Sequence, residues 1–392
     1  MDRAVLVSVA IAVGVAVLVV GLGLAVGWSA VRSDPSATCV PALTWSVTNA
    51  TSDLGDNYAP GSLQAFGDNG SGIVTGGIGS FNDTKPSDFS SPVLTALGGV
   101  RGSAPTNLTG LVEPYFHGGG VFVPVWNGTS WLIVGSAGWG ARSSEGAAVA
   151  IDPDGVHNLS GEIQPYFAGG GIWIGAWNGS AYLLGGQGPH GAALVSLQGN
   201  SVRDYSPLVP STGDNSWIQM LGWNGTAWTV GGFGVLALFE EGRLTDLRVK
   251  MPFPGGGVYG IGWNGTTWMF AGSPTQPVAW DGSHVIPGPT LPKGFDAWTN
   301  MVLPFAGGWL FAGGGVSPTG RDTAQVAYAS SCPGAPVVDL AGQLPGAFDG
   351  GYVQFGAPAP AIASNEVLLV GNGGIEVPAF SSHGAAAYVM AR

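Results

Sequence analysis

The stretch AWNGSAYLLGG, Ala176–Gly186, decides the fold, because close copies of it recur along the chain. The Asn-Gly copies centre on Trp126, Trp177, Trp223 and Trp263, which are 51, 46 and 40 residues apart. Asn-Gly between two apolar, aromatic-rich runs is a strong β-hairpin signal, and it predicts a type I′ turn with positive φ at both central residues. A repeat of about 40 to 50 residues is typical of propeller blades.

Each hairpin is followed by a third apolar run and then a fourth that finishes near an aromatic residue, as in residues 146–167. Further copies begin at residues 62, 298 and 351, which makes seven, and no useful helical period follows residue 30. The seventh copy supplies only three strands, whereas residues 40–53 resemble an unpaired fourth strand. The sequence therefore predicts an all-β, seven-bladed β-propeller of four-stranded blades, closed by this N-terminal strand.

The glycine pairs that end the second strands, as in LLGGQ (183–187) and TVGGF (229–233), resemble kelch repeats, which form propellers. Kelch blades place their Tyr and Trp after the glycines, whereas here the aromatics precede them. The tail of GTSW (128–131) is similar to part of the Asp-box turn of sialidase-type propellers, but Trp126 stands where the defining Asp belongs. The resemblance implies a propeller and transfers no catalytic residue.

The hydrophobic run 4–28 carries no charge and is long enough to span a bilayer. We therefore predict a membrane anchor over residues 1–30, a linker over 31–43 and the propeller over 44–392. The alternative is a secretory peptide cleaved near Ser29-Ala30. The flanking arginines leave the orientation open, but cysteines and sequons beyond the span favour a single-pass cell-membrane protein with an extracytoplasmic propeller.

Both cysteines lie beyond this span, and their positions predict a disulfide that locks the ring. Cys39 precedes the closing strand, and Cys332 lies between the third and fourth strands of the sixth copy. Two unpaired thiols are the alternative.

Nine Asn-x-Ser/Thr sequons also follow the span and predict a glycoprotein. They are Asn49, Asn69, Asn82, Asn107, Asn127, Asn158, Asn178, Asn224 and Asn264. The alternative is that a chain rich in Asn, Gly, Ser and Thr produces such triplets by chance.

The two faces of the predicted ring differ. The hairpin face carries the turns between first and second strands and between third and fourth strands, and the loop face carries the other connections. Five sequons fall in hairpins, and we expect Asn107 and Asn158 to open fourth strands at the same face. We therefore expect the glycans to look toward the membrane, and the loop face to meet a protein or carbohydrate partner.

The composition excludes some partners. Only 9% of the residues are charged, and the formal net charge is −12. With three lysines among 12 basic residues, no basic stripe can neutralise phosphates, so nucleic acid is excluded as a partner.

Few side chains in the predicted loops can do chemistry. The candidate ligand-binding residues are Arg142, Glu145, His190, Asp214 and His383. Of these, Glu145, His190 and His383 each precede Gly-Ala-Ala, and three such groups at one level of a ring could converge on a ligand or metal. They come from separate blades without metal-ligand spacing, and no catalytic motif occurs, so we predict no metal, no cofactor and no catalytic residue.

The sequence therefore favours a surface binding or scaffold module over an enzyme, because aromatic and amide groups suit stacking and neutral hydrogen bonds. One alternative is a glycan-active hydrolase or lyase using Arg142, Glu145 and Asp214. Another is a structural subunit of a cell-surface layer. An acidic cluster at the axial mouth would favour the enzyme, and a wide apolar patch on the outer edge would favour the lattice.

Overall fold

The computed structural model describes residues 43–58, 61–81, 89–98, 104–138, 144–251, 253, 256–273, 276–295, 298–316, 322–332, 334–358, 365–373 and 383–392. Within these ranges no helix has the length and apolar character needed to cross a membrane. The predicted anchor, residues 4–28, lies outside the described residues.

The described strands form five four-stranded antiparallel sheets and one eight-stranded sheet. The first sheet contains β2 (Gly61–Asp68), β3 (Gly72–Phe81), β4 (Phe89–Gly98) and β5 (Thr106–Asn107). The second contains β6 (Gly120–Trp126), β7 (Trp131–Ala137), β8 (Glu145–Asp152) and β9 (Gly155–Asn158). The third contains β10 (Gly171–Trp177), β11 (Tyr182–Gly188), β12 (Gly191–Gln198) and β13 (Ser201–Asp204).

The eight-stranded sheet has two halves that follow the same order. One half contains β14 (Trp217–Trp223), β15 (Trp228–Phe233), β16 (Val235–Glu240) and β17 (Arg243–Asp246). The other contains β18 (Gly257–Trp263), β19 (Trp268–Ser273), β20 (Val278–Trp280) and β21 (Val285–Pro287). A single pair, Phe233 with Gly257, joins β15 to β18.

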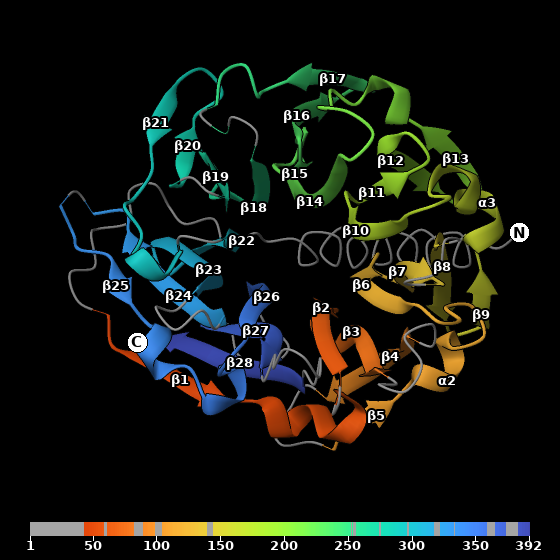
Figure 1. The fold of residues 1–392 in the computed structure, drawn as a ribbon, viewed down its shortest axis with the longest axis horizontal. Coiled ribbons are helices and arrows are strands. Elements are labelled where there is room, and N and C mark those ends of the chain that lie inside the picture. Colours follow the sequence, from red (N-terminus) through yellow and green to blue (C-terminus); the bar gives the residue numbers. More distant parts are fainter. Residues whose placement is uncertain are drawn as a thin grey trace, which may run out of the picture.

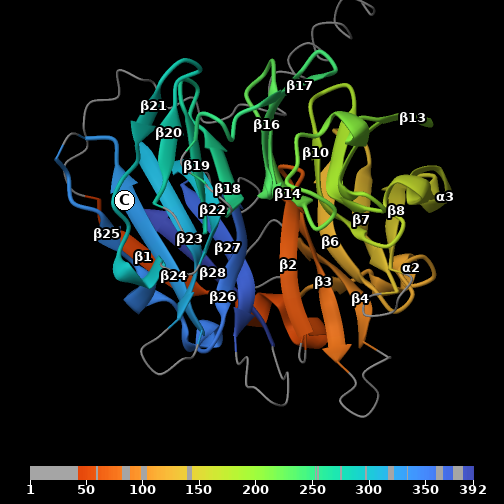
Figure 2. The ribbon, with the colours of Figure 1, turned by 45° about the horizontal axis from the view of Figure 1, so that its top comes forward.

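The last two sheets complete the ring. One contains β22 (Trp298–Phe305), β23 (Gly308–Val316), β24 (Asp322–Ser330) and β25 (Val338–Asp339). The other contains β26 (Tyr352–Pro358), β27 (Glu366–Gly373), β28 (His383–Ala391) and β1 (Trp45–Asn49). The sheets surround a common centre, with the first strand of each group innermost (Figure 1). Figure 2 shows these inner strands running along the depth of the ring. The molecule is therefore a β-propeller.

The N-terminal strand closes the ring, as the sequence predicts. β1 pairs antiparallel with β28 from Trp45↔Ala391 to Asn49↔Ala387, and Figure 1 shows the two strands side by side. Thr44 and Arg392 exchange two backbone hydrogen bonds of 2.9 Å. The ring of Trp45 lies 4.6 Å from that of Tyr328 on β24, so the closing strand also packs on the preceding sheet. The first and last described segments are thereby held together.

The turn type predicted for the Asn-Gly hairpins is wrong. Glycine has positive φ in these turns, 101° at Gly128 and 95° at Gly179, but no Asn does among the described residues. The reason is that Oδ1 of Asn127 accepts the backbone N–H groups of Thr129 and Ser130 at 2.9 and 2.8 Å. The side chain thus takes the place of the turn's own carbonyl, and only the first central residue needs positive φ, as in type II′ turns.

The fourth strands are shorter than the sequence suggests. β9 ends at Asn158, and a helical turn, α3 (Ser160–Ile163), follows it. Oδ1 of Asn158 accepts the N–H of Ser160, and the Ser160 hydroxyl bonds both backbone groups of Ala148 on β8. These bonds turn the chain away from the sheet at Asn158, before the aromatic residues near which the fourth strand is predicted to end. α2 (Thr109–Val112) and the η3 turn (Ser206–Leu208) follow β5 and β13 in the same way.

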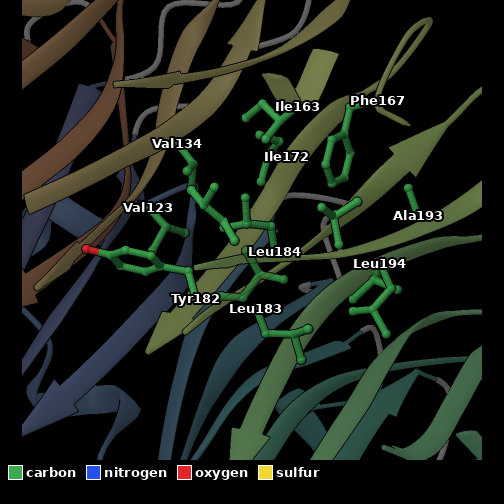
Figure 3. Close-up of a cluster of buried hydrophobic side chains, with 14 of the residues drawn as sticks. Val123, Val134, Ile163, Phe167, Ile172, Tyr182, Leu183, Leu184, Ala193 and Leu194 are labelled. Atoms are coloured by element: carbon green, nitrogen blue, oxygen red, sulfur yellow. The ribbon is translucent and has the colours of Figure 1, made fainter. Parts of the chain in front are cut away.

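Apolar side chains between neighbouring sheets form the core. Figure 3 shows Val134, Ile172 and Leu184, each with no exposed surface, in one such cluster. Burying a side chain of this size contributes about 1.5–3 kcal/mol. The hairpin aromatics add to this packing: the rings of Trp177 and Tyr182 lie 4.7 Å apart, and burial raises the pKa of Tyr182 to about 12. Trp177 and Tyr182 belong to one sheet, but a methyl group on Gly67 of β2 or on Gly262 of β18 would lie nearer than 3.0 Å to the ring of Trp131 or Trp309 on the next sheet. At these hairpins the prediction that the rings pack between blades is confirmed.

Candidate functional site

Every inner strand is interrupted near its start by a register shift, where it has one more residue than the second strand opposite it. For β6 the pairing passes from Val121 to Val123, so Phe122 is the bulged residue. The equivalent residues all line the central cavity, and we call them the channel ring. The channel ring consists of Gln64, Phe122, Trp173, Gln219, Tyr259, Asn300 and Gln354.

A glycine on each second strand makes room for the bulge. A methyl group on Gly186 would lie nearer than 3.0 Å to the carbonyl oxygen of Gly171, two residues before Trp173. The same holds at every inner strand: the glycine faces the carbonyl oxygen two residues before the channel-ring residue. These glycines are Gly77, Gly135, Gly186, Gly232, Gly272, Gly313 and Gly371. Gly186 and Gly232 are the second members of the Gly-Gly pairs in the sequence. These pairs therefore permit the bulges that direct Trp173 and Gln219 into the channel.

Aromatic rings occupy one arc of the channel ring and one separate position. The Phe122 and Trp173 rings stack with centroids 5.0 Å apart and planes 2° from parallel. Tyr259 folds back over its own strand, where a methyl group on Gly257 would collide with the phenol. Desolvation raises the Tyr259 pKa, so the phenol is neutral and can donate a hydrogen bond.

Amides fill the remaining four positions, and three of them make a side-chain hydrogen bond. Nε2 of Gln64 donates to the Ser62 hydroxyl at 2.7 Å, and Oε1 of Gln219 accepts from the Trp217 indole at 3.3 Å. Nδ2 of Asn300, 8% exposed, donates to the Val353 carbonyl at 3.0 Å, across to the next inner strand. Each of these bonds uses one end of the amide, so the other end is left for a ligand or water.

The channel ring lies near the loop face. Phe122 is the third residue of β6 and Gln64 the fourth of β2, and inner strands enter from that face. At about 3.3 Å per residue the ring lies about 7–10 Å below the mouth. The cavity at this level measures only ≈ 30 Å³, enough for water but not for a sugar residue. The channel ring therefore forms a polar and aromatic floor beneath the mouth.

The residues predicted to bind a ligand are not brought together. Arg142 lies outside the described residues. Glu145 is the first residue of β8, and His383 is the first of β28, where its Nε2 lies 3.0 Å from the Ala347 carbonyl. His190 and Asp214 are exposed in turns beside β12 and before β14. None of the four lines the central cavity, and the described residues contain no group of three acidic, His or Cys side chains placed to hold a metal.

Turn chemistry explains the sequons. In the hairpin sequons Asn69, Asn127, Asn178, Asn224 and Asn264, Oδ1 accepts two backbone N–H groups at 2.7–3.0 Å and the sequon's own hydroxyl. Asp281 makes the same backbone bonds between β20 and β21. Since the Asp281 carboxylate accepts the same backbone N–H groups, these turns require a side-chain oxygen and do not require an asparagine.

The sequons on fourth strands obey the same rule. Asn49, Asn107 and Asn158 each accept an N–H two residues on at 2.9 Å, and Asp204 accepts one at 2.8 Å from the equivalent place. Asn107 and Asn158 end their strands, so the expectation that they open them is wrong. They lie midway along the outer edge, opposite Thr95 and Val149, and not on the hairpin face. Asn82 lies outside the described residues.

The cysteine pair is described at one end only. Cys332 lies in the turn between β24 and β25, as predicted, and its N–H donates to the Ser330 hydroxyl at 3.1 Å. Cys39 lies outside the described residues. Tyr328, four residues before Cys332, contacts Trp45, the first residue of the closing strand.

The channel ring is absent from the predicted site residues, although the sequence carries a signal for it. In four of the copies the channel-ring residue stands four positions before the Trp that ends the inner strand: Phe122, Trp173, Gln219 and Tyr259. Aligning the copies on that Trp places these residues in one column. The varied chemistry of the column hides it from a search for reactive residues.

Comparisons with known proteins support the fold. No family model matches the chain, and no curated protein matches its sequence. The chain is similar to the GH74 xyloglucanase from Xanthomonas campestris, with 11% identity, 88% of this chain and 55% of that chain covered and a TM-score of 0.53. A chain of the mitotic checkpoint complex gives 12% identity, coverage of 90% and 96% and a TM-score of 0.52.

A further similarity is to the β-propeller domain of the Trilobed protease from Pyrococcus furiosus, with 9% identity, coverage of 83% and 92% and a TM-score of 0.49. The match to the xyloglucanase covers 55% of that chain, so this chain spans little more than half of its length. The likeness to the xyloglucanase and to the checkpoint-complex chain, at 11% and 12% identity, shows the fold alone.

Proposed function

We propose that this protein is a membrane-anchored, extracytoplasmic binding or scaffold module whose loop face takes a neutral, hydroxyl-rich ligand such as an oligosaccharide. The channel ring carries this proposal. Its amides and its stacked Phe122–Trp173 pair offer neutral hydrogen bonds and a flat apolar surface, which together suit the polar edges and apolar faces of sugars. The narrow floor means that a ligand would bind above the channel ring, in the mouth.

The same features favour binding over glycan hydrolysis. Glycosidases generally need two carboxyl groups about 5–9.5 Å apart across the scissile bond. The described residues that line the cavity include no carboxylate, and Glu145 and Asp214 belong to different parts of the ring. These observations support a ligand that is held and not cleaved.

Exposed apolar side chains support the loop face as the contact surface. Leu111 in α2 is 40% exposed, Leu208 at the end of η3 is 54% exposed, and Val249 after β17 is 81% exposed. All three lie in connections from a fourth strand to the next sheet, which run from the outer edge to the loop face. The other large hydrophobic side chains that are exposed among the described residues, Val285 and Ile286, are neighbours on β21 at the outer edge. A lattice subunit would need a wider outer patch than this pair.

The proposal includes seven blades of kelch-like repeats. It treats the eight-stranded sheet as two blades, because only Phe233↔Gly257 joins the halves. It also includes anchorage through residues 4–28, glycans on the sequons and a Cys39–Cys332 disulfide. The uncharged run, the position of the sequons and cysteines beyond it, and the Trp45–Tyr328 contact support these parts.

The test is binding of neutral oligosaccharides to the full chain in lipid nanodiscs, measured by calorimetry beside a polyanionic glycan. We expect a neutral glycan to bind, and Trp173→Ala to weaken it at least tenfold. Trp126→Ala is the matched control, since Trp126 also pairs with an aromatic ring, at 5.2 Å, but at the hairpin face. Equal losses in both variants, or binding of the polyanion alone, would refute the proposal.

A further inference from the structure

A second cavity opens on the loop face between the two halves of the eight-stranded sheet. Its volume is ≈ 250 Å³. Buried apolar side chains form its wall, namely Val235, Leu236, Phe253 and Val258, which are 1–6% exposed. We call this cavity the seam pocket, because its lining residues Gly234, Gly256 and Val258 are chain neighbours of the single β15–β18 pair.

The short connection between β15 and β16 leaves the seam pocket uncovered. Gly234 alone links the two strands, with φ 68°, whereas the equivalent connection from β7 to β8 runs from Ala137 to Glu145. Thr212 packs over Gly234 where a side chain would otherwise stand. Gly234 and Thr212 therefore form this edge of the seam pocket.

One ion pair supplies the polar part of the seam pocket. Nε and Nη2 of Arg248 donate to the Asp246 carboxylate at 3.0 and 2.8 Å, and Nη1 donates to the Gly234 carbonyl at 3.0 Å. The pair lowers the Asp246 pKa and raises that of Arg248, so both groups stay charged and cancel each other. Arg248 retains N–H groups beyond these three bonds, which can donate to a neutral acceptor such as a carbonyl.

We propose that the seam pocket receives an apolar side chain of a partner protein, with Arg248 donating to the adjacent main-chain carbonyl of that partner. Three observations favour this occupant. The cavity is smaller than the roughly 300–1,000 Å³ typical of sites for drug-sized ligands. Its two charged groups, Asp246 and Arg248, neutralise each other, which disfavours anions. Val249 at its rim is 81% exposed, and Leu208 on the preceding connection is 54% exposed.

This arrangement matches the anatomy of a protein interface. A partner side chain in a desolvated pocket, surrounded by apolar and polar contacts that exclude water, is the usual form of a binding hot spot. The site does not depend on the channel ring, so it is independent of the ligand proposed for the mouth.

The test uses N-acetyl-leucinamide as a mimic of an apolar residue in a chain, and isovalerate and N-acetyl-lysinamide as charged comparisons. Binding to the full chain in nanodiscs is followed by saturation-transfer NMR. We expect saturable binding of the leucinamide, at least tenfold tighter than binding of either charged probe. Tighter binding of isovalerate would show an anion site and overturn the proposal.

Two surface variants locate the binding. Thr212→Trp fills the opening and should weaken leucinamide binding at least tenfold, whereas Ser211→Trp, at an exposed neighbour outside the lining, should leave it unchanged. Val249→Asp should weaken binding about threefold, and Val285→Asp on the outer edge is its control. Unchanged binding in both pocket variants, or self-association of the chain that Val249→Asp abolishes, would overturn the proposal. Oligosaccharide binding by Thr212→Trp tests the mouth separately, and should match that of the unmodified chain.

Discussion

Replacing Gly186 with alanine tests the link between the diglycines and the channel ring. The added methyl group would lie nearer than 3.0 Å to backbone atoms of Gly171, including its carbonyl oxygen, which has no flexible end to move aside. Overpacking of this kind costs about 1–3 kcal/mol. Unfolding entropy is about 2.1 cal/mol/K per residue, or about 0.8 kcal/mol/K for this chain, so the melting temperature should fall by about 1–4 °C.

The assay is calorimetric melting of the full chain, with Gly161→Ala as the matched control. Gly161 lies in α3, with no atom within 4 Å of an added methyl group and no positive φ. Alanine there should raise the melting temperature slightly, by about 1 °C or less, because a helical glycine is less favourable by about 0.5–1 kcal/mol. If Gly186→Ala melts no lower than Gly161→Ala, the bulge does not depend on its glycine and the reasoning is refuted.

Three further predictions concern the turns and the closure. Burial raises the pKa of Tyr58 from 10.0 to about 12, so the neutral phenol that bonds Thr75 should contribute about 2–3 kcal/mol below pH 10 that is lost between pH 10 and 12. Tyr58→Phe should show a smaller fall in melting temperature over that range, and an equal fall would contradict the assignment. In unglycosylated protein, Asn178→Asp should melt like the unmodified chain, whereas Asn178→Ala should lose about 1 kcal/mol; equal losses would remove the turn explanation. Mass spectrometry should show a Cys39–Cys332 bridge, and Cys332→Ser should lower melting by about 5 °C, whereas two free thiols would exclude the bridge.

The sequence predicts the repeat architecture because the signals for it are local. Asn-Gly between aromatic runs specifies hairpins, and the N-terminal strand completes the last sheet, where it pairs from Trp45 to Asn49 as expected. The predicted type I′ turn is wrong because the asparagine side chain accepts the backbone N–H groups of the turn, which favours a turn with only one positive φ. The fourth strands are shorter than predicted because the side chains of Asn158 and Ser160 bond to the backbone and turn it away from the sheet. Hydrophobic periodicity gives no sign of these bonds.

The candidate site could not be predicted in the same way. A bulge moves one residue off the alternation of a strand, so Phe122 and Trp173 look like interior positions in a pattern with period two. Glu145, His190 and His383 share a position in the repeat, but equal position around a ring does not bring side chains together. The reactive residue types therefore predict a site in the loops, whereas the bulges that place side chains in the channel lie in the inner strands.

The central claim is that the channel ring and its mouth form the ligand-binding surface. The most direct measurement is fluorine NMR of the fluorotryptophan-labelled full chain in nanodiscs, titrated with neutral oligosaccharides. Trp173→Phe and Trp126→Phe assign the two resonances that matter. The account predicts that the Trp173 resonance moves on titration while the Trp126 resonance stays fixed. Movement of the Trp126 resonance with an unchanged Trp173 resonance would place binding on the hairpin face and contradict the claim.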